Sequence, residues 1–166
     1  MPGRHRFRTL GLAVAGLLVV ALVTRSGSAR PVLVVPSSES VPWGIYWVSY
    51  GAEWDRGSLV VFRPPKAALD MWPGEVAEGD GLWMKRVAAA AGDLVCATED
   101  GLWVNGAKAD GVAPPAKAPT RPALRGCERL PEGTVYLTGD GPRSLDSRYW
   151  GPADACQIVA PAARVL

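Results

Sequence analysis

An uncharged run of 16 residues, from Thr9 to Thr24, follows three arginines near the N-terminus of this chain. Its length lies between the apolar core of a secretory signal peptide, about 7–15 residues, and a membrane-spanning helix, about 17–25 residues. Because a basic flank stays in the cytoplasm in both cases, whatever follows the run is exported. We therefore expect a basic cytoplasmic flank at 1–8, a transmembrane anchor at 9–29 and an extracytoplasmic domain at 30–166.

The same segment could instead be removed from the mature protein. Gly-Ser-Ala at 27–29 has the small residues of a signal-peptide cleavage site, and cleavage would release a secreted product. We favour an uncleaved anchor, because Thr9 and the small residues at 26–29 can lengthen the span. Either outcome places the rest of the chain in a compartment where cysteines can pair.

The exported part is rich in residues that end regular structure. The chain has 19 glycines and 15 prolines, which favours short strands and turns, and hence a mainly β domain. Glu-Asp-Gly at 99–101 and Asn-Gly at 105–106 predict tight hairpin turns. A Pro-rich loop is expected at 107–131 and one helical turn at 68–72. The expected strands are 32–36, 44–49, 58–63, 81–90, 93–98, 102–104 and 134–138.

Composition also excludes several classes of function. A net charge of +2 is too small to argue for nucleic-acid binding. The only histidine is His5, on the cytoplasmic flank, so no Ser-His-Asp or Cys-His site can form in the exported domain. Cys96, Cys127 and Cys156 allow three choices of a single pair, and their spacing does not fit a zinc site. The absence of a Cys-x-x-Cys motif argues against a thiol–disulfide protein.

Lys85 differs from the other lysines of the exported part, because it interrupts the strand-like sequence Leu-Trp-Met-Lys-Arg-Val. A period of two places it on one face with Trp83 and Val87. Apolar neighbours disfavour the ammonium, and lowering the pKa of a lysine from about 10.4 to about 7.5 requires about 4 kcal/mol. Lys85 is therefore a candidate general base. An edge-strand lysine whose amine reaches water would give the same pattern.

Two polar segments accompany this strand. Ser-Ser-Glu-Ser-Val-Pro-Trp-Gly-Ile-Tyr at 37–46 lies between two strand-like runs, and Gly-Asp-Gly-Pro-Arg-Ser-Leu-Asp-Ser-Arg-Tyr-Trp-Gly-Pro at 139–152 follows a third. Taken singly, each is compatible with an ordinary turn, the second held by an ion pair between Asp146 and Arg148. A serine nucleophile here would need a lysine or a carboxylate as its base, because no histidine is available.

The order of the blocks changes this interpretation. Ser-Val-Pro-Trp-Gly-Ile-Tyr at 40–46, Ser-Leu-Val-Val-Phe-Arg-Pro-Pro at 58–65, the Lys85 strand and the block at 139–152 follow one another as in type I signal peptidases, the Ser/Lys-dyad family. The chain most resembles the short TraF-type branch that serves conjugative transfer. The resemblance covers nearly the whole exported domain. It implies a signal-peptidase-like, twisted antiparallel β domain behind one transmembrane helix, and a membrane-anchored serine endopeptidase without cofactor or metal.

The resemblance also implies a role for each matching residue. Ser40 corresponds to the nucleophile and Lys85 to the unprotonated general base. Ser38 corresponds to the hydroxyl that forms the oxyanion hole with the Ser40 backbone N–H, and Ser144 to the hydroxyl that orients the base. Two charged pairs would shape the site without acting on substrate, and their members are Arg86, Asp140, Asp146 and Arg148.

The nucleophile segment favours one branch of the family. A single residue separates Ser40 from Pro42. The resemblance to housekeeping signal peptidases is weaker here, because two residues separate the serine from the proline in that branch. The expected substrates are therefore exported precursors with membrane-bound signal or pilin segments, cut after small residues and released by water or by an amine. A housekeeping signal peptidase and an inactive scaffold relative are the alternatives. The expected location is the bacterial inner membrane, crossed once, with the catalytic domain in the periplasm.

Two further expectations concern the surroundings of the site. Cys127 closes the Pro-rich loop 31 residues after Cys96 (127 − 96), and a bridge between them would restrain that loop by about 3–4 kcal/mol and leave the third cysteine over. Trp43, Ile45 and Trp47 alternate onto one strand face. Tryptophan favours the membrane interface, so this face is expected to contact membrane lipid, with an ordinary core face as the alternative.

Overall fold

The structure is a computed structural model that describes residues 32–71, 81–98, 101–109, 124, 126–141 and 144–166. The chain divides into two compact units, Met1–Pro31 and Val32–Leu166, and the described residues belong to the second. The expected flank at 1–8 and the expected anchor at 9–29 lie outside the described residues. Within the described ranges, no helix has the length and apolar character needed to cross a membrane.

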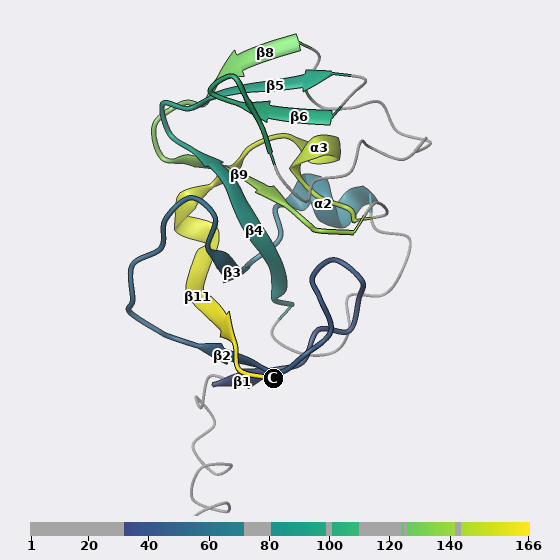
Figure 1. Cartoon of the computed structure of the whole chain (residues 1–166), viewed down its shortest axis with the longest axis vertical. Coiled ribbons are helices and arrows are strands. Elements are labelled where there is room, and N and C mark those ends of the chain that lie inside the picture. The colour runs from purple at the N-terminus through teal and green to yellow at the C-terminus, as the bar shows by residue number, and fades with distance from the viewer. Residues whose placement is uncertain (1–31, 72–80, 99–100, 110–123, 125, 142–143) are drawn as a thin grey trace, which may run out of the picture. The chain divides into compact units, whose positions relative to one another are not determined.

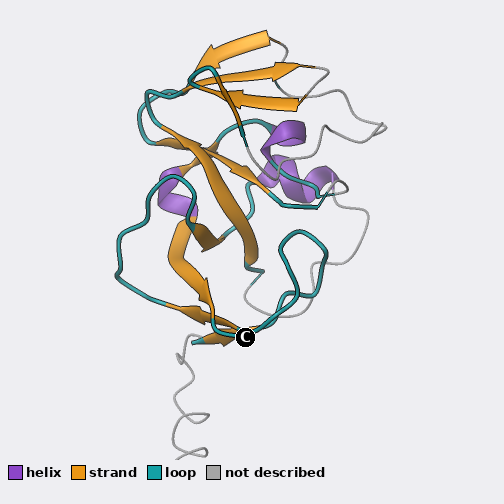
Figure 2. Cartoon of the chain, in the orientation of Figure 1, coloured by secondary structure: helices purple, strands orange, loops and turns teal. Residues whose placement is uncertain are grey.

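Seven strands form the larger of two antiparallel sheets (Figures 1 and 2). They are β1 (Leu33–Val34), β2 (Tyr46–Val48), β3 (Leu59–Phe62), β4 (Trp83–Ala90), β9 (Thr134–Thr138), β10 (Ala153–Asp154) and β11 (Ile158–Arg164). Their order in the sheet is β1-β2-β11-β3-β4-β9-β10, and each adjacent pair is antiparallel. The short helical elements are α2 (Lys66–Met71), α3 (Ser147–Trp150) and the 3-10 turn η1 (Ala155–Gln157). The expectation of a mainly β, antiparallel domain is therefore confirmed.

Four strands form the second sheet, which lies beyond the end of β4 at the top of Figure 1. They are β5 (Leu94–Thr98), β6 (Gly101–Val104), β7 (Ala107–Lys108) and β8 (Gly126–Arg129), in the order β7-β6-β5-β8. Asn105 and Gly106 both have positive φ, 51° and 81°, as the predicted two-residue hairpin requires. A disulfide joins Cys96 of β5 to its cross-strand neighbour Cys127 of β8, and Cys156 is free and exposed. The predicted pairing is thus confirmed.

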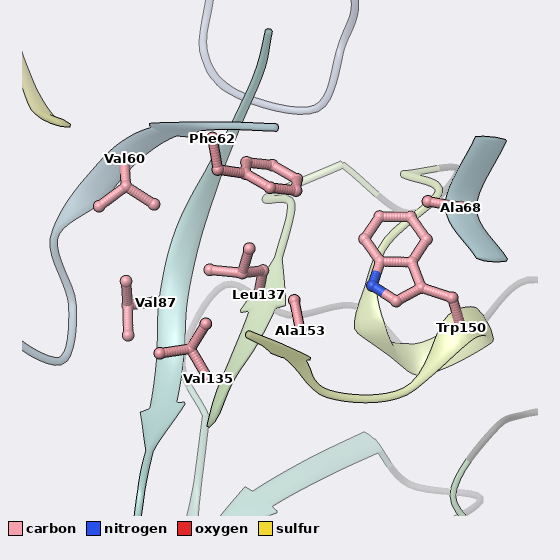
Figure 3. Close-up of a cluster of buried hydrophobic side chains, with 8 residues drawn as sticks. All are labelled: Val60, Phe62, Ala68, Val87, Val135, Leu137, Trp150 and Ala153. Carbon is pink, nitrogen blue, oxygen red and sulfur yellow. The ribbon is translucent and has the colours of Figure 1, made fainter. Parts of the chain in front are cut away.

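The main core lies between one face of the seven-stranded sheet and helices α2 and α3 (Figure 3). Figure 3 shows Trp150 of α3 beside Ala68 of α2, with Phe62 and Leu137 between them and the sheet. Trp83 packs against this cluster, with its ring centroid 5.8 Å from that of Trp150. Because the helices are short, they are held by this packing more than by their own hydrogen bonds.

The opposite face of the same sheet is also buried. Val61 and Met84 pack there with Val41 from the loop between β1 and β2. Strand β3 therefore has apolar side chains on both faces, which explains its uninterrupted sequence Leu-Val-Val-Phe. The burial of Val41 also fixes one side of this loop at 35–45, the serine-rich loop.

Some parts of the predicted fold are wrong. Strand β11 was not expected, because its sequence Ile-Val-Ala-Pro-Ala-Ala-Arg has few residues that favour strands. It nevertheless lies between β2 and β3. Pro161 is tolerated because its backbone faces the end of β2, where its carbonyl accepts a hydrogen bond from the Ser49 N–H at 3.0 Å.

The second correction concerns the predicted Pro-rich loop at 107–131. Strands β7 and β8 occupy its two ends, and residues 110–123 and 125 lie outside the described residues. β8 pairs with β5, so the returning end of the segment completes the small sheet. Several predicted strands are also shorter than expected: 32–36 becomes β1, and 44–49 becomes β2.

Candidate active site

Ser40 lies in the loop between β1 and β2, the segment that the sequence placed between two strand-like runs. Its backbone is held from two sides: Val41 is buried in the core, and the Ser40 carbonyl accepts a hydrogen bond from the Asp140 N–H at 2.7 Å. The Tyr46 hydroxyl donates to the Pro42 carbonyl at 2.7 Å and fixes the far side of the loop. These contacts hold the Ser40 backbone in place while its side chain is half-buried.

Lys85 is the third residue of β4, opposite Val60 of β3, and it is 3% exposed. Its Nζ hydrogen-bonds to Ser40 Oγ at 2.5 Å and to Ser144 Oγ at 2.8 Å. The two hydroxyl oxygens are 3.3 Å apart. The structure thus brings together three of the residues singled out in the sequence, and the amine of Lys85 is directed to two serines instead of to water.

Burial is the largest influence on the pKa of Lys85, which falls to about 8 because the ammonium is poorly solvated there. The carboxylates of Asp146 and Asp140 raise this pKa, whereas Arg148 lowers it. Each carboxylate hydrogen-bonds to an arginine, so neither is dedicated to Lys85. Among the described residues, the hydrogen-bond partners of the amine are the two serine hydroxyls.

Asp146 and Arg148 form an ion pair beneath the site, with side chains 0% and 3% exposed. Arg148 Nη2 and Nε donate to the two carboxylate oxygens at 2.6 and 2.7 Å. The same carboxylate caps α3 through the Arg148 N–H and accepts a hydrogen bond from the Gly139 N–H at 2.9 Å. These hydrogen bonds compensate the buried charges, as buried charges require. They also link the end of β9 to the segment that carries Ser144.

Arg86 and Asp140 form a second ion pair at the rim of the site. Arg86 donates from Nε and Nη2 to the two oxygens of Asp140, at 3.1 and 2.9 Å, and from Nη1 to the Gly57 carbonyl at 2.9 Å. The side chains are 34% and 25% exposed, so water screens this pair more than the buried one. Both predicted charged pairs are present in the structure.

Two functional positions were missed by the sequence interpretation, Gly139 and Gly141. A Cβ on Gly139 would lie 2.8 Å from the Ser40 carbonyl oxygen and would overlap the Ser144 side chain. A Cβ on Gly141 would overlap the Glu39 carbonyl oxygen. The Gly-Asp-Gly sequence after a strand was the available signal, since glycine is used where two backbone segments approach closely.

An open cleft of about 560 Å³ lies beside Ser40 and is lined by residues on both sides of it. Ser38, the expected oxyanion residue, is exposed on this cleft wall. The complete lining comprises Pro36, Ser37, Ser38, Glu39, Val41, Pro42, Trp43, Asp140 and Gly141. No group of three or more histidine, cysteine or carboxylate side chains suited to a metal occurs in the described part of the chain.

Comparisons with known proteins give the family and the relatives of this chain. The family model described as signal peptidase, peptidase S26, matches residues 7–166. Two plasmid transfer proteins TraF from Escherichia coli are each 34% identical to the chain, one over 161 residues (89% of each protein) and one over 149 residues (80% of this chain and 81% of the relative). A crystal structure of a signal peptidase I from Enterococcus faecalis V583 aligns with a TM-score of 0.45 and 22% identity, over 66% of this chain and 97% of that one. The match of the family model over almost the whole chain, together with the two relatives, shows that the chain belongs to the signal peptidase family, peptidase S26.

Proposed function

We propose that this chain is a serine endopeptidase in which Ser40 is the nucleophile and Lys85 the general base. The observation that carries the proposal is the buried amine of Lys85, 2.5 Å from Ser40 Oγ and with a pKa lowered to about 8. At pH 7, such a lysine is neutral in roughly a tenth of the molecules, compared with fewer than about one in a thousand for an ordinary lysine. A neutral amine at this distance accepts the hydroxyl proton.

The reaction follows from the positions of these groups. Ser40 Oγ attacks the carbonyl carbon of the scissile peptide bond while its proton passes to Lys85 Nζ. The Ser40 N–H and the Ser38 hydroxyl donate to the resulting oxyanion, and Lys85 then protonates the leaving amine. An acyl-enzyme remains, and water or another amine attacks its ester carbon while Lys85 takes a proton from that nucleophile. The bond from this carbon to Ser40 Oγ then breaks, and Lys85 returns the proton to Ser40 Oγ. Ser144 holds the amine of Lys85 in line throughout.

We further propose that the substrates are exported precursors of a conjugative transfer apparatus, pilin-type proteins among them. The two TraF relatives and the single residue between Ser40 and Pro42 support this choice over general secretory precursors. Lys85 and Ser40 are both present and in hydrogen-bond contact, which argues against an inactive scaffold.

Mass spectrometry of a precursor after exposure to the wild-type enzyme and to Ser40→Ala tests the proposal. We expect new termini in a pilin-type precursor with the wild type alone, and little processing of a general secretory precursor. A product whose new carboxyl end is joined to an amine would identify aminolysis, and a free carboxylate would identify hydrolysis. Equal cleavage by Ser40→Ala would refute the mechanism, and rescue of a cell depleted of its essential signal peptidase would favour the housekeeping alternative.

The proposed location is the bacterial inner membrane, with the N-terminus in the cytoplasm and the domain in the periplasm. The uncharged run after the N-terminal arginines supports an anchor. The disulfide between Cys96 and Cys127 supports an exported domain, since such bonds persist mainly outside the cytoplasm.

Of the predicted face of Trp43, Ile45 and Trp47, Trp47 alone lies in strand β2, and the exposed side of β1 and β2 around it is the proposed lipid-facing surface. Leu33 and Trp47 are cross-strand partners with 56% and 49% exposure, and Val35 and Val165 are similarly exposed. Large exposed apolar groups clustered on one sheet face are typical of interaction surfaces. Tryptophan fluorescence of the isolated domain is expected to shift on addition of anionic vesicles, and the shift should be smaller in Trp47→Ser. Tryptophan fluorescence that does not change when vesicles are added would contradict a lipid-facing role.

A further inference from the structure

The serine-rich loop ends beside the residues that follow β11. Strands β2 and β11 lie side by side in the larger sheet (Figure 1), and hydrogen bonds between the two backbones continue beyond them. The Val165 N–H donates to the Ile45 carbonyl at 2.8 Å, and the Ile45 N–H donates to the backbone oxygen of Leu166 at 3.0 Å. Arg164 Nε donates to the same oxygen at 2.9 Å. Residues 164–166, which we call the C-terminal segment, are therefore hydrogen-bonded to the end of the loop.

Gly44 makes this close approach possible. A Cβ on Gly44 would overlap the backbone oxygen of Leu166 and would lie 2.6 Å from Arg164 Nε. Gly44 is not one of the glycines with positive φ, so its backbone conformation is accessible to alanine. Glycine is needed at this position because two backbone segments meet there, and not because of its own φ.

The stretch between Ser40 and β2 has few other contacts that fix its backbone. The Pro42 carbonyl accepts a hydrogen bond from the Tyr46 hydroxyl at 2.7 Å. Trp43 is 78% exposed, so the packing of its side chain contributes little to the position of this stretch. The contact between Gly44 and the C-terminal segment is the next one along the chain, four residues after the proposed nucleophile.

We infer that the C-terminal segment positions the nucleophile through Gly44 and Ile45, an inference that rests on the proposed peptidase function. A side chain at position 44 must either displace the loop or push Leu166 away, and the second response breaks the hydrogen bonds of that residue. Both responses allow Ser40 Oγ to move from Lys85 Nζ, which lies 2.5 Å away. Because other contacts still hold the loop, kcat should fall roughly tenfold, less than the roughly hundredfold effect of a misplacement by about 1 Å.

Kinetics of Gly44→Ala in the full chain test this inference, with the precursor that the wild type cleaves as substrate. We expect kcat to fall roughly tenfold and KM to stay within about twofold, since Gly44 does not line the cleft. Deletion of Leu166 removes the hydrogen bond to Ile45 without adding a clash, and kcat should fall roughly threefold. A kcat of Gly44→Ala within about twofold of the wild type would overturn the inference.

The combination of the two changes shows whether the effect passes through the Leu166 backbone. In the chain that lacks Leu166, Gly44→Ala should lower kcat no further, because the oxygen that the new Cβ would meet is gone. Leu166→Ala is the matched background, since it keeps this oxygen and changes a side chain that is 74% exposed. There Gly44→Ala should lower kcat as much as in the wild type. An equal loss of kcat with and without Leu166 would contradict the inference.

Amide hydrogen exchange separates this inference from the proposed function. The Asp140 N–H donates to the Ser40 carbonyl at 2.7 Å, so its exchange rate reports the position of the nucleophile without any substrate. It should rise roughly threefold or more in Gly44→Ala. The Leu130 N–H, which donates to the Asp93 carbonyl beside the smaller sheet at 2.9 Å, is the control for a general loss of stability, and its rate should not change.

The two assays can fail independently. If the wild type cleaves no precursor, the peptidase proposal fails, and faster exchange of the Asp140 amide in Gly44→Ala would still support the positioning role of the C-terminal segment. An Asp140 amide that exchanges at the wild-type rate in Gly44→Ala would overturn that role whatever the outcome of the cleavage assay. Equal acceleration of the Asp140 and Leu130 amides would also overturn it, because the substitution would then destabilise the whole domain.

Discussion

The two sheets of the domain are stabilised by different means. The buried polar side chains of the described residues all belong to the seven-stranded sheet or to the segments packed on it, and they are Lys85, Thr138, Ser144, Asp146, Ser147 and Arg148. In the four-stranded sheet the buried side chains are apolar, Val95, Leu102 and Val104 among them, and a disulfide links β5 to β8. Burying an amine and an ion pair costs free energy, whereas apolar burial and a cross-link stabilise.

The buried polar groups of the larger sheet lower the stability of the domain, and they are the groups to which we assign the proposed chemistry. A general base needs a lowered pKa, and burial lowers it only by making the charged form unfavourable. We therefore expect changes in the larger sheet to affect activity, sometimes with an opposite effect on stability. Changes in the smaller sheet should affect stability alone.

The largest effect is expected for Lys85→Met. Loss of the proposed general base should lower kcat/KM by roughly 10³- to 10⁴-fold. The free energy of unfolding at pH 7 should nevertheless rise by about 1–3 kcal/mol, because methionine fills the space without a buried charge. Enzyme kinetics and denaturant unfolding measure the two quantities, with Lys108→Met on the exposed strand β7 as control.

Lys85→Arg provides a second check on the same residue. A guanidinium remains protonated and cannot act as a base, so this variant should also be inactive. Turnover by Lys85→Arg within about tenfold of the wild type would be incompatible with the proposed role of the lysine.

The next largest effect is expected from breaking the buried ion pair. Arg148→Met leaves the Asp146 carboxylate buried without its main partner, and the free energy of unfolding should fall by about 3–5 kcal/mol. Replacing both members, with Asp146→Leu added, should recover part of that loss. Thermal and denaturant unfolding check this prediction. A double variant less stable than Arg148→Met would show that the Asp146 hydrogen bonds to Gly139 and to the α3 N-terminus outweigh its charge.

In the smaller sheet, the disulfide gives the matching test. Replacement of Cys96 and Cys127 by alanine should lower the free energy of unfolding by about 3–4 kcal/mol, as expected for a closed loop of 31 residues. Cleavage of a good substrate should be unchanged once the protein is folded, since no predicted catalytic residue lies in this sheet. Cys156→Ala is the control and should alter neither quantity. A loss of kcat in the disulfide variant would break the proposed separation between the two sheets.

The strands that could be predicted are those with local signals. β3 and β4 are apolar runs, and Asn105–Gly106 specifies its hairpin by backbone preference alone. β11 could not be predicted in this way, because its alanines and Pro161 have no strand preference of their own. Its conformation depends on β2 and β3, which lie about a hundred residues earlier in the chain.

The residues of the candidate site also differ in whether the local sequence could indicate them. A lysine within an apolar strand indicated Lys85 directly, and the family resemblance supplied Ser40 and Ser144. The Gly-Asp-Gly sequence was the signal for the glycines at 139 and 141, but the sequence did not show what approaches them. In the folded chain the Ser144 side chain and the Ser40 carbonyl lie against Gly139, and the Glu39 carbonyl lies against Gly141. A local glycine pattern therefore indicates close approach without identifying the distant partner.

The pH dependence of activity and of stability tests the comparison of the two sheets, because both should depend on Lys85 in the larger sheet. Activity should rise about tenfold per pH unit up to about pH 8 and then level off, so that kcat/KM at pH 6 is roughly a hundredth of its plateau. The unfolded chain keeps the Lys85 proton up to about pH 10.5 and the folded chain only up to about pH 8. Between these values the unfolded state binds more protons, so the free energy of unfolding should increase with pH. Lys85→Met should abolish that increase, and an unchanged increase would assign it to another group.

The smallest effect is expected at the rim of the site, from Asp140→Asn. The Asp140 backbone N–H that holds the Ser40 carbonyl is retained in this variant, and only the charge that faces Arg86 is removed. Because this pair is partly exposed, its loss should cost about 1 kcal/mol or less, with a decrease in kcat/KM of no more than about fivefold. Added salt should reduce the difference in stability between Asp140→Asn and the wild type, because salt screens a partly exposed pair. It should have little influence on the stability loss in Arg148→Met, where the pair is buried. Asp70→Asn, which removes the more exposed Lys66–Asp70 pair of α2, is the control and should have no measurable effect. If Asp140→Asn lost as much stability and activity as Arg148→Met, the Asp140 carboxylate would have to position the nucleophile through its side chain. The contrast between the buried and the exposed ion pair would then not hold within the larger sheet.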